Sequence, residues 1–145
     1  MSKKTGLRKQ VRKLIRNWAA PAGCGLFFLF LLKFVFFCGY VPSASMEPAI
    51  HKGSFIFGIR IFGELQRGEV VVFEHEGRLL VKRIAGVSGD VVYSGSGRML
   101  VVPAGYYYML GDNCSESSDS RYWDEPFVGR MQIIARVVVR KQHPY

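Results

Sequence analysis

The sequence predicts a mainly β protein, a compact antiparallel β-barrel or sandwich that follows one N-terminal transmembrane helix. Three observations support this fold class: a long apolar stretch from Ala19 to Tyr40, a series of short apolar runs after it, and glycines between those runs. A chain of 145 residues accommodates one domain of ordinary size with an appendage. We expect a basic cytoplasmic leader over residues 1–16, a transmembrane helix over 17–33 and an extracytoplasmic β-domain over 34–145.

The leader carries most of the positive charge. The net charge is +9, and the first 17 residues contribute +7 because they hold seven basic residues and no acid. The rest of the chain has 13 basic and 11 acidic residues, a balance of +2. Domains that bind nucleic acid keep a basic patch in their folded part. We therefore expect no nucleic-acid partner.

The apolar stretch is long enough to cross a bilayer, which takes roughly 17 to 25 apolar residues in a helix. Basic residues on one flank predict that this flank stays in the cytoplasm. Lys33 divides the stretch, and we place it near the outer interface, where its amine reaches water. A cleavable secretory signal is the alternative interpretation. The length of the apolar segment favours an uncleaved, single-pass anchor.

The rest of the chain shows no convincing helical period. Residues 34–41 would leave the membrane as an extended segment. Short apolar runs separated by glycine turns are typical of an antiparallel sandwich or barrel. The expected strands cover residues 54–62, 69–73, 78–85, 91–93, 99–102, 106–110 and 132–140.

Ser43 and Ser45 follow the apolar stretch, and a serine hydroxyl needs a base beside it to become a nucleophile. The three histidines lack a carboxylate at suggestive spacing, which leaves Lys82 as the best candidate for the base. In a strand, Lys82 and Arg83 point to opposite faces, so one of them faces apolar surroundings if one face is the core. A lysine loses its proton there, whereas an arginine does not. Taken alone, Lys82 also fits a surface edge strand, and the serines also fit a polar turn.

The segment from Gly111 to Arg121 is dense in capping and turn-forming residues. It predicts a loop with an ion pair between Asp119 and Arg121. Cys24 and Cys38 lie in or near the apolar stretch, which leaves Cys114 alone beyond it, so we expect no internal disulfide framework there. No segment has metal-ligand spacing, and we expect neither a metal nor another cofactor.

Four ordered motifs together closely resemble the signatures of the type I signal peptidases. They correspond to that family's serine–methionine signature, glycine–aspartate strand, lysine–arginine box and last box. The matching segments are 42–48 (PSASMEP), 68–73 (GEVVVF), 81–90 (VKRIAGVSGD) and 111–121 (GDNCSESSDSR). The resemblance runs from the membrane exit to about Gly129, and it implies a β-domain of the signal peptidase type.

The resemblance implies a role for each matching residue. Ser45 would attack the scissile carbonyl and form an acyl-enzyme. Lys82 would act as the base, first for Ser45 and then for the water that releases the product. The Ser43 hydroxyl and the Ser45 backbone N–H would form the oxyanion hole. The supporting residues would be Ser117, which holds the lysine amine, Asp119 and Arg121, which form a structural pair, and Met46, which is buried beside the nucleophile.

Several positions depart from the family's pattern. Ala44 replaces the usual glycine, Glu69 stands where aspartate is common, and Ser88 where proline is common. Residues 114–116 replace an arginine-aspartate-asparagine run, and residues 122–129 diverge most. These departures leave Ser45 and Lys82 in place and bear on substrate preference.

The resemblance implies a membrane-bound serine endopeptidase that uses a serine–lysine dyad to cleave leader peptides from exported preproteins. It implies small residues one and three positions before the cut, and an enzyme on the outer face of the bacterial cytoplasmic membrane. The partners would be preproteins and the lipid bilayer, and the oligomeric state stays open. A dedicated peptidase that matures a conjugative pilin precursor is the runner-up. Two further alternatives are an inactive membrane-tethered β-module that binds partners and an autocleaving repressor-type protein.

Overall fold

The computed structural model describes residues 3–138, with side chains described from Asn17 onward. The chain divides into two compact units, Met1–Val35 and Phe36–Tyr145.

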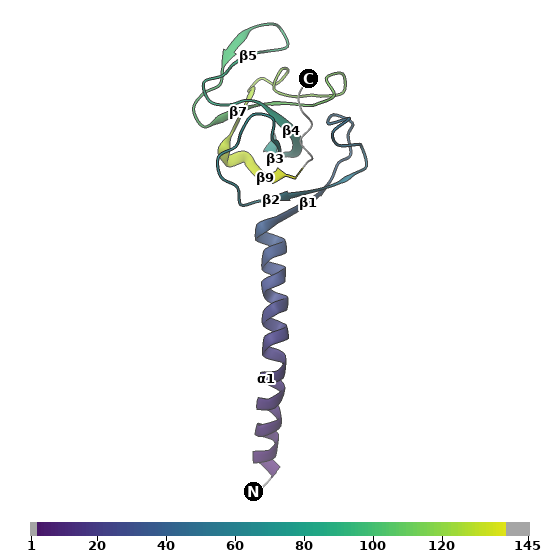
Figure 1. Ribbon diagram of the computed structural model, residues 1–145, viewed down its shortest axis with the longest axis vertical. Coiled ribbons are helices and arrows are strands. Elements are labelled where there is room, and N and C mark those ends of the chain that lie inside the picture. Colours follow the sequence, from purple (N-terminus) through teal and green to yellow (C-terminus); the bar gives the residue numbers. More distant parts are fainter. Residues whose placement is uncertain (1–2, 139–145) are drawn as a thin grey trace. The chain divides into compact units, whose positions relative to one another are not determined.

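The first unit is helical. Helix α1 spans Lys3–Phe30, contains Pro21 and is followed by the π-helical turn η1, Leu31–Val35 (Figure 1). The helix begins well before residue 17 because the basic leader is rich in lysine and arginine, which are good helix formers. One stretch, Asn17–Val35, is long and apolar enough to cross a membrane.

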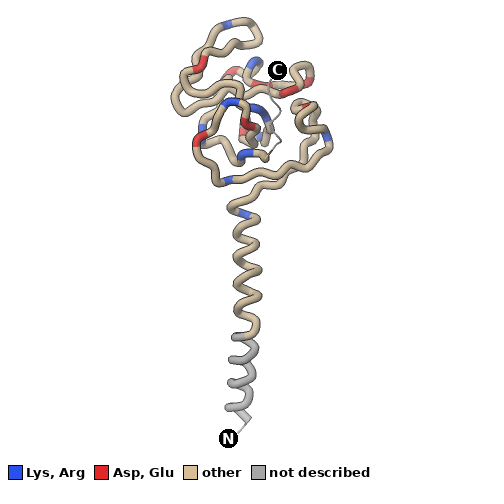
Figure 2. Tube along the Cα trace, in the orientation of Figure 1, with Lys and Arg blue, Asp and Glu red and all other residues tan. Residues whose placement is uncertain are grey.

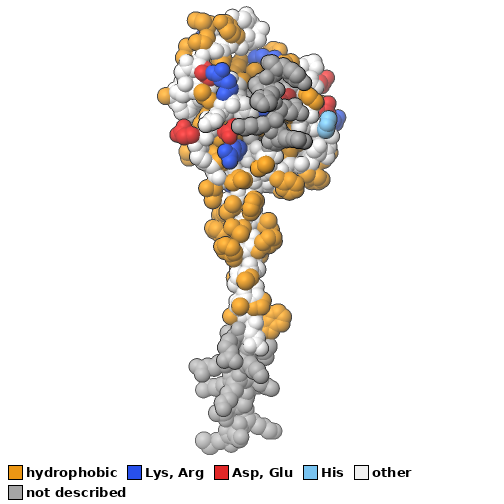
Figure 3. Space-filling model, in the orientation of Figure 1, with side chains coloured by type: hydrophobic (Ala, Val, Ile, Leu, Met, Phe, Trp, Pro, Cys, Tyr) orange, Lys and Arg blue, Asp and Glu red, His pale blue; other side chains and the backbone are white. Residues whose placement is uncertain are grey.

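The side chains of this stretch are exposed. Large apolar residues such as Leu26 and Phe27 are more than 60% exposed, and hydrophobic side chains line the visible face of the described part of the helix (Figure 3). A helix that is apolar on all sides is stable in a protein interior or in lipid. No residue of Asn17–Val35 is buried inside the protein, so lipid is the environment that suits it.

The second unit is a seven-stranded antiparallel sheet with a separate hairpin. The sheet has the strand order β1-β2-β9-β3-β4-β7-β8, and β5 pairs with β6 to form the hairpin. The bounds are β1 Phe36–Tyr40, β2 Phe55–Ile59, β3 Val70–His75, β4 Arg78–Gly86, β5 Val91–Tyr93, β6 Met99–Val101, β7 Tyr106–Leu110, β8 Phe127–Gly129 and β9 Ile133–Val137. A 3₁₀ turn, η2, covers Arg130–Gln132.

Strand β3 is buried on both faces. Val70 and Val72 belong to one apolar cluster, which also contains Met46 and Ile56. The alternate residues Val71 and Phe73 belong to a second cluster, around Ile84, Tyr107 and Met109. The sequence of a strand with two buried faces is typically a continuous apolar run. This explains the unbroken sequence VVVF and places β3 at the centre of the domain.

The structure confirms the mainly β, antiparallel fold with one N-terminal apolar helix. The strands expected at 91–93 and 106–110 have the observed bounds of β5 and β7. Two strands were missed. Residues 36–40, expected only to be extended, pair with β2 as β1, and β8 lies in the divergent segment 122–129.

Other strand bounds differ at their ends. Strand β2 ends at Ile59 rather than residue 62, because the chain then enters a loop. Strand β9 covers Ile133–Val137 of the expected 132–140, since residue 132 lies in η2. Residues 139 and 140 lie outside the described part of the chain.

Charges in the β-domain are mixed in sign. Acidic and basic residues alternate over its surface loops and strands (Figure 2), as the near-neutral balance of the sequence after the leader indicates. Several are engaged in ion pairs, among them Arg83 with Asp112 and Arg121 with Asp119. The domain therefore carries its charges as local pairs rather than as one basic face.

Candidate active site

Ser45 lies on the loop that connects β1 to β2. Val41 and Met46 on this loop are buried in the first apolar cluster, which fixes one side of it. Asn113 holds the other side: its backbone N–H donates to the Ser45 carbonyl oxygen at 3.0 Å, and its Nδ2 donates to the Ala44 carbonyl oxygen at 3.2 Å. The nucleophile candidate is therefore held between the core and the 111–121 loop.

The Ser45 side chain is only 6% exposed. Its hydroxyl lies 3.3 Å from the hydroxyl of Ser43, within hydrogen-bond distance. Met46, directly after it, is fully buried. The structure thus brings together three of the residues that the sequence singled out around the serine motif.

Lys82 lies on β4 with its side chain in the interior. It is 3% exposed and shares a buried face with Ile84, whereas its neighbours Val81 and Arg83 on the opposite face are half-buried. The alternation of the strand therefore points the lysine, and not the arginine, into the protein. Arg83 instead forms an ion pair with Asp112, with two nitrogen–oxygen distances of 2.7 and 2.6 Å.

A chain of hydrogen bonds orients the Lys82 amine. Its Nζ donates to Ser117 Oγ at 2.9 Å, and the Ser117 hydroxyl donates to Asp119 Oδ2 at 2.7 Å. Because an ionised carboxylate only accepts hydrogen bonds, Ser117 gives its proton to Asp119 and accepts from the lysine. An uncharged amine that donates one hydrogen to Ser117 keeps its lone pair for another partner.

The carboxylate at the end of this chain is fully buried and has several donors. Arg121 Nε and Nη2 donate to Asp119 at 2.9 and 2.8 Å, and the Gly111 backbone N–H donates at 3.0 Å. The ion pair expected from the sequence is therefore present. Burial acts to raise the pKa of Asp119, but the hydrogen bonds from Arg121, Gly111 and Ser117 outweigh it and hold that pKa below its ordinary value.

Burial lowers the pKa of Lys82 from its ordinary value of 10.5. The positive charge of Arg121 lowers it further, whereas the carboxylates of Asp119 and Asp112 act in the opposite direction. Desolvation prevails because an ammonium without water is costly to keep charged. The amine is thus shifted toward the uncharged form that a general base needs.

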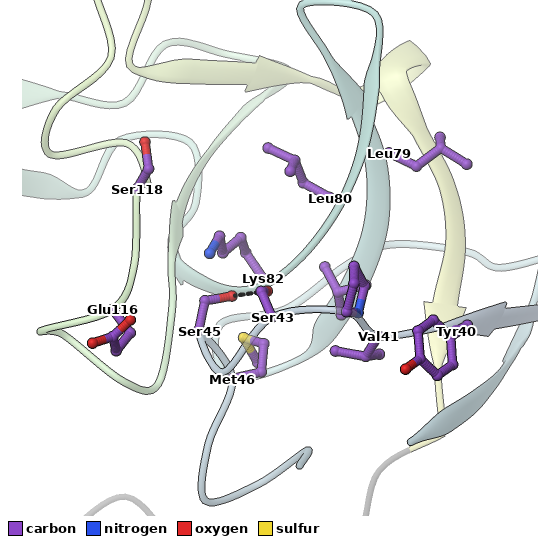
Figure 4. A pocket seen from close by; sticks show the side chains of 12 residues that line it. Tyr40, Val41, Ser43, Ser45, Met46, Leu79, Leu80, Lys82, Glu116 and Ser118 are labelled. Carbon is purple, nitrogen blue, oxygen red and sulfur yellow. Dashed lines mark hydrogen bonds between the residues drawn. The ribbon is translucent and has the colours of Figure 1, made fainter. Parts of the chain in front are cut away.

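Ser45 and Lys82 line the same cavity of about 310 Å³. Figure 4 shows their side chains at the centre of this cavity, with Ser43 and Met46 beside them. Tyr40, Val41 and Leu79 line one side, and Glu116 and Ser118 line the other. The cavity is large enough for part of an extended peptide to lie across the two candidate catalytic groups.

Gly111 allows the loop to pass close to the serine motif. A Cβ atom at this position would lie 2.6 Å from the Ser45 carbonyl oxygen and closer still to Ser117 Oγ. Both distances are shorter than real Cβ contacts. Only glycine therefore lets Ser117 and Ser45 approach from the two sides of this backbone.

Sequence reasoning missed two contacts that build the site. It did not foresee that Asn113 holds the backbone of Ala44 and Ser45, or that Asp112 pairs with Arg83. Because Lys82 and Arg83 alternate along the strand, the sequence indicates that Arg83 needs a partner on the face opposite Lys82. Which residue is that partner depends on the tertiary structure. Among the residues the structure describes, no three His, Cys, Asp or Glu side chains gather as they would around a metal ion.

Comparison with known proteins places the chain in a family. The family described as "Signal peptidase, peptidase S26" matches residues 15–102 and 93–141, which together cover most of the chain. A probable signal peptidase I-2 of Synechocystis is 32% identical over 70% of this chain and 61% of its own length. Signal peptidase I of Pseudomonas fluorescens is 28% identical over 59% of this chain and 55% of its own length.

A mitochondrial relative shows the breadth of the similarity. Mitochondrial inner membrane protease subunit 1 of Mus musculus is 33% identical over 54% of either chain. The chain thus spans little more than half the length of these relatives. The match from residue 15 to residue 141 includes the anchor helix, the serine motif, the lysine strand and the 111–121 loop. This chain therefore belongs to the signal peptidase family, peptidase S26.

Proposed function

We propose that this protein is a membrane-bound serine endopeptidase that removes leader peptides from exported preproteins, cutting after small-x-small sequences. One observation carries the proposal: the buried Lys82 amine lines the same cavity as the Ser45 hydroxyl and is oriented by Ser117. Family membership and relatives that are signal peptidases support the same activity.

Uncharged Lys82 would act as the general base. It takes the proton of the Ser45 hydroxyl as Ser45 Oγ attacks the scissile carbonyl carbon, and the resulting ammonium then gives that proton to the leaving amine. The carbon–nitrogen bond breaks, and the leader stays attached to Ser45 as an ester. Lys82 next takes a proton from water as the water oxygen attacks the ester carbon. The resulting ammonium gives that proton to Ser45 Oγ as the carbon–oxygen bond breaks, which frees Ser45 and releases the leader with a carboxyl end.

Ser43 would stabilise the negative charge that develops on the carbonyl oxygen. Its hydroxyl lies 3.3 Å from Ser45 Oγ, so it lies beside the atom that forms the new bond. The Ser45 backbone N–H would be the second donor. A donor placed at a developing oxyanion typically contributes about 2.7 to 4 kcal/mol to catalysis.

The apolar helix would anchor the enzyme in the bacterial cytoplasmic membrane, with the β-domain on the outer face. Its exposed apolar side chains suit lipid, and the basic leader favours a cytoplasmic N-terminus. Preproteins carry apolar leaders in the same membrane. Confinement of enzyme and substrate to one surface raises their effective concentration.

Cleavage of a purified preprotein by the full-length protein in detergent tests this function. Ser45→Ala and Lys82→Arg should both abolish cleavage, the latter because arginine stays charged and cannot accept the proton. Ser96→Ala and Lys52→Arg are matched controls at exposed positions outside the cavity and should cleave normally. Normal cleavage by Lys82→Arg would refute the lysine base. Absence of cleavage by the wild-type protein would favour an inactive binding module.

Maturation of a single conjugative pilin precursor stays a prediction, because none of the relatives named above carries that description. Comparison of turnover on general preproteins and on the products of neighbouring genes would distinguish a general leader peptidase from a peptidase dedicated to one precursor.

A further inference from the structure

The 111–121 loop contributes one acidic side chain to the cavity. Of the described residues that line it, Glu116 is the only acid and Lys82 the only base. Figure 4 places Glu116 and Ser118 on one side of Ser45, and Tyr40, Val41 and Leu79 on the other. The cavity therefore has an apolar side and an acidic side, with the proposed reacting atoms between them.

The charge of Glu116 is available to a ligand. The two other acids near it in the loop are neutralised, since Asp112 pairs with Arg83 and Asp119 with Arg121. Among residues 17–138, no hydrogen bond or ion pair engages the Glu116 carboxylate, and the side chain is exposed. Its carboxylate is also not among the charges that shift the pKa of Lys82.

The backbone of Glu116 is nevertheless well placed. Its N–H donates to the Asn113 carbonyl oxygen at 3.2 Å, and the next residue, Ser117, is buried against Lys82 and Asp119. Glu116 therefore lines the cavity from an anchored stretch of backbone rather than from a free loop tip.

We propose that Glu116 is a specificity-determining residue that selects preproteins with a lysine or arginine among the first three residues after the cut. This inference rests on the proposed function. Small uncharged residues before the cut suit the apolar side formed by Val41 and Leu79, so the residues after the cut lie along the opposite side. A carboxylate there attracts a basic side chain and disfavours an acidic one.

The expected effect is modest because the pair stays in contact with water. Exposed ion pairs are weak, which corresponds to a preference of about two- to five-fold in kcat/KM for lysine over glutamine. Screening at 1 M salt, where the Debye length is about 3 Å, should remove most of that preference.

Peptides that span a small-x-small site test the proposal with the full-length protein in detergent. Lysine, glutamine or glutamate is placed in turn at each of the three positions after the cut, and kcat/KM is measured at low and high salt. Glu116→Gln should abolish the lysine preference, and Glu116→Lys should reverse it in favour of glutamate. Glu64→Gln is the matched control, because Glu64 is exposed and lines a different cavity; it should keep the preference.

Equal kcat/KM for lysine and glutamine at all three positions would overturn this inference while leaving the proposed function intact. A lysine preference that persists in Glu116→Gln would also overturn it, since another group would then be responsible. If the wild-type protein cleaved none of the peptides and no preprotein, the proposed function itself would fail.

Discussion

The Lys82 amine donates a hydrogen bond of 2.9 Å to the hydroxyl of Ser117, whose own proton is directed to Asp119. This arrangement holds the amine in position against the 111–121 loop. The proposed base thus depends on a loop residue that is 35 positions away in the sequence.

Ser117→Ala should lower kcat by about 10²-fold, because loss of the acceptor lets the amine move and small misplacements of reacting groups cost that much. KM should change little, since Ser117 is not among the residues that line the cavity. Ser120→Ala is the matched control: this buried serine of the same loop accepts from the Met109 N–H. It should lower the free energy of unfolding by about 1 to 3 kcal/mol and affect kcat far less.

The rate of cleavage should rise with pH as Lys82 loses its proton. The pKa of Lys82 is lowered by burial, so the rising limb of kcat/KM should have an apparent pKa below 10.5. A profile of initial rates from pH 5 to pH 10 measures it. A flat profile from about pH 5 to pH 9 would contradict a lysine base.

Ser43→Ala should reduce kcat by about 10²- to 10³-fold, the usual effect of removing one oxyanion donor. The free energy of unfolding should be nearly unchanged, since the side chain is exposed. Ser43→Thr, which keeps the hydroxyl, serves as the conservative comparison in the same assay. An unchanged kcat in Ser43→Ala would remove Ser43 from the oxyanion hole.

Asp119→Asn should lower the free energy of unfolding by about 3 to 5 kcal/mol at neutral pH, because Arg121 loses its buried partner. The pKa of Asp119 is depressed in the folded state, so its stabilising effect is complete above the ordinary aspartate pKa of 3.8 and lost as the pH falls through the folded-state pKa. Urea unfolding between pH 3 and pH 8 measures both the loss of unfolding free energy at neutral pH and its dependence on pH. The difference between the wild type and Asp119→Asn should shrink at the acid end, and a difference that grew there would contradict the assignment.

Gly111→Ala should impair both folding and turnover. The added methyl group would collide with the Ser45 carbonyl oxygen and with Ser117, and overpacking of this kind costs about 1 to 3 kcal/mol. The control is Gly63→Ala, since a Cβ at Gly63 meets nothing within 4 Å. Thermal unfolding and kcat together measure the effect. Equal behaviour of the two variants would mean that the loop does not need to approach Ser45 so closely.

Much of this architecture was accessible from the sequence because it depends on local patterns. Alternation along a strand was enough to place Lys82 and Arg83 on opposite faces of the sheet. Apolar runs bounded by glycine located β5 and β7. Strand β1 was not recognised because its sequence, FFCGY, continues the apolar stretch of the helix. Its strand character comes from pairing with β2.

Contacts between distant segments were beyond the reach of pattern reasoning. The bonds from Asn113 to Ala44 and Ser45 join residues nearly 70 positions apart, and nothing in the local sequence identifies the partner. The same holds for the position of Glu116 in the cavity. Serine, asparagine and acidic residues in a loop predict turns equally well whether they face solvent or a reactive group.

The neighbours Lys82 and Arg83 would make the proposed activity sensitive to strand alignment. If β4 slipped by one residue against β3, a guanidinium would enter the cavity in place of the amine. The hydrogen bonds from Arg83 to Asp112 and to the Gly68 carbonyl oxygen oppose that slip and thereby stabilise the correct register. On the proposed mechanism, a molecule with β4 out of register would be inactive rather than partly active, so specific activity would report on the fraction of molecules with the correct register.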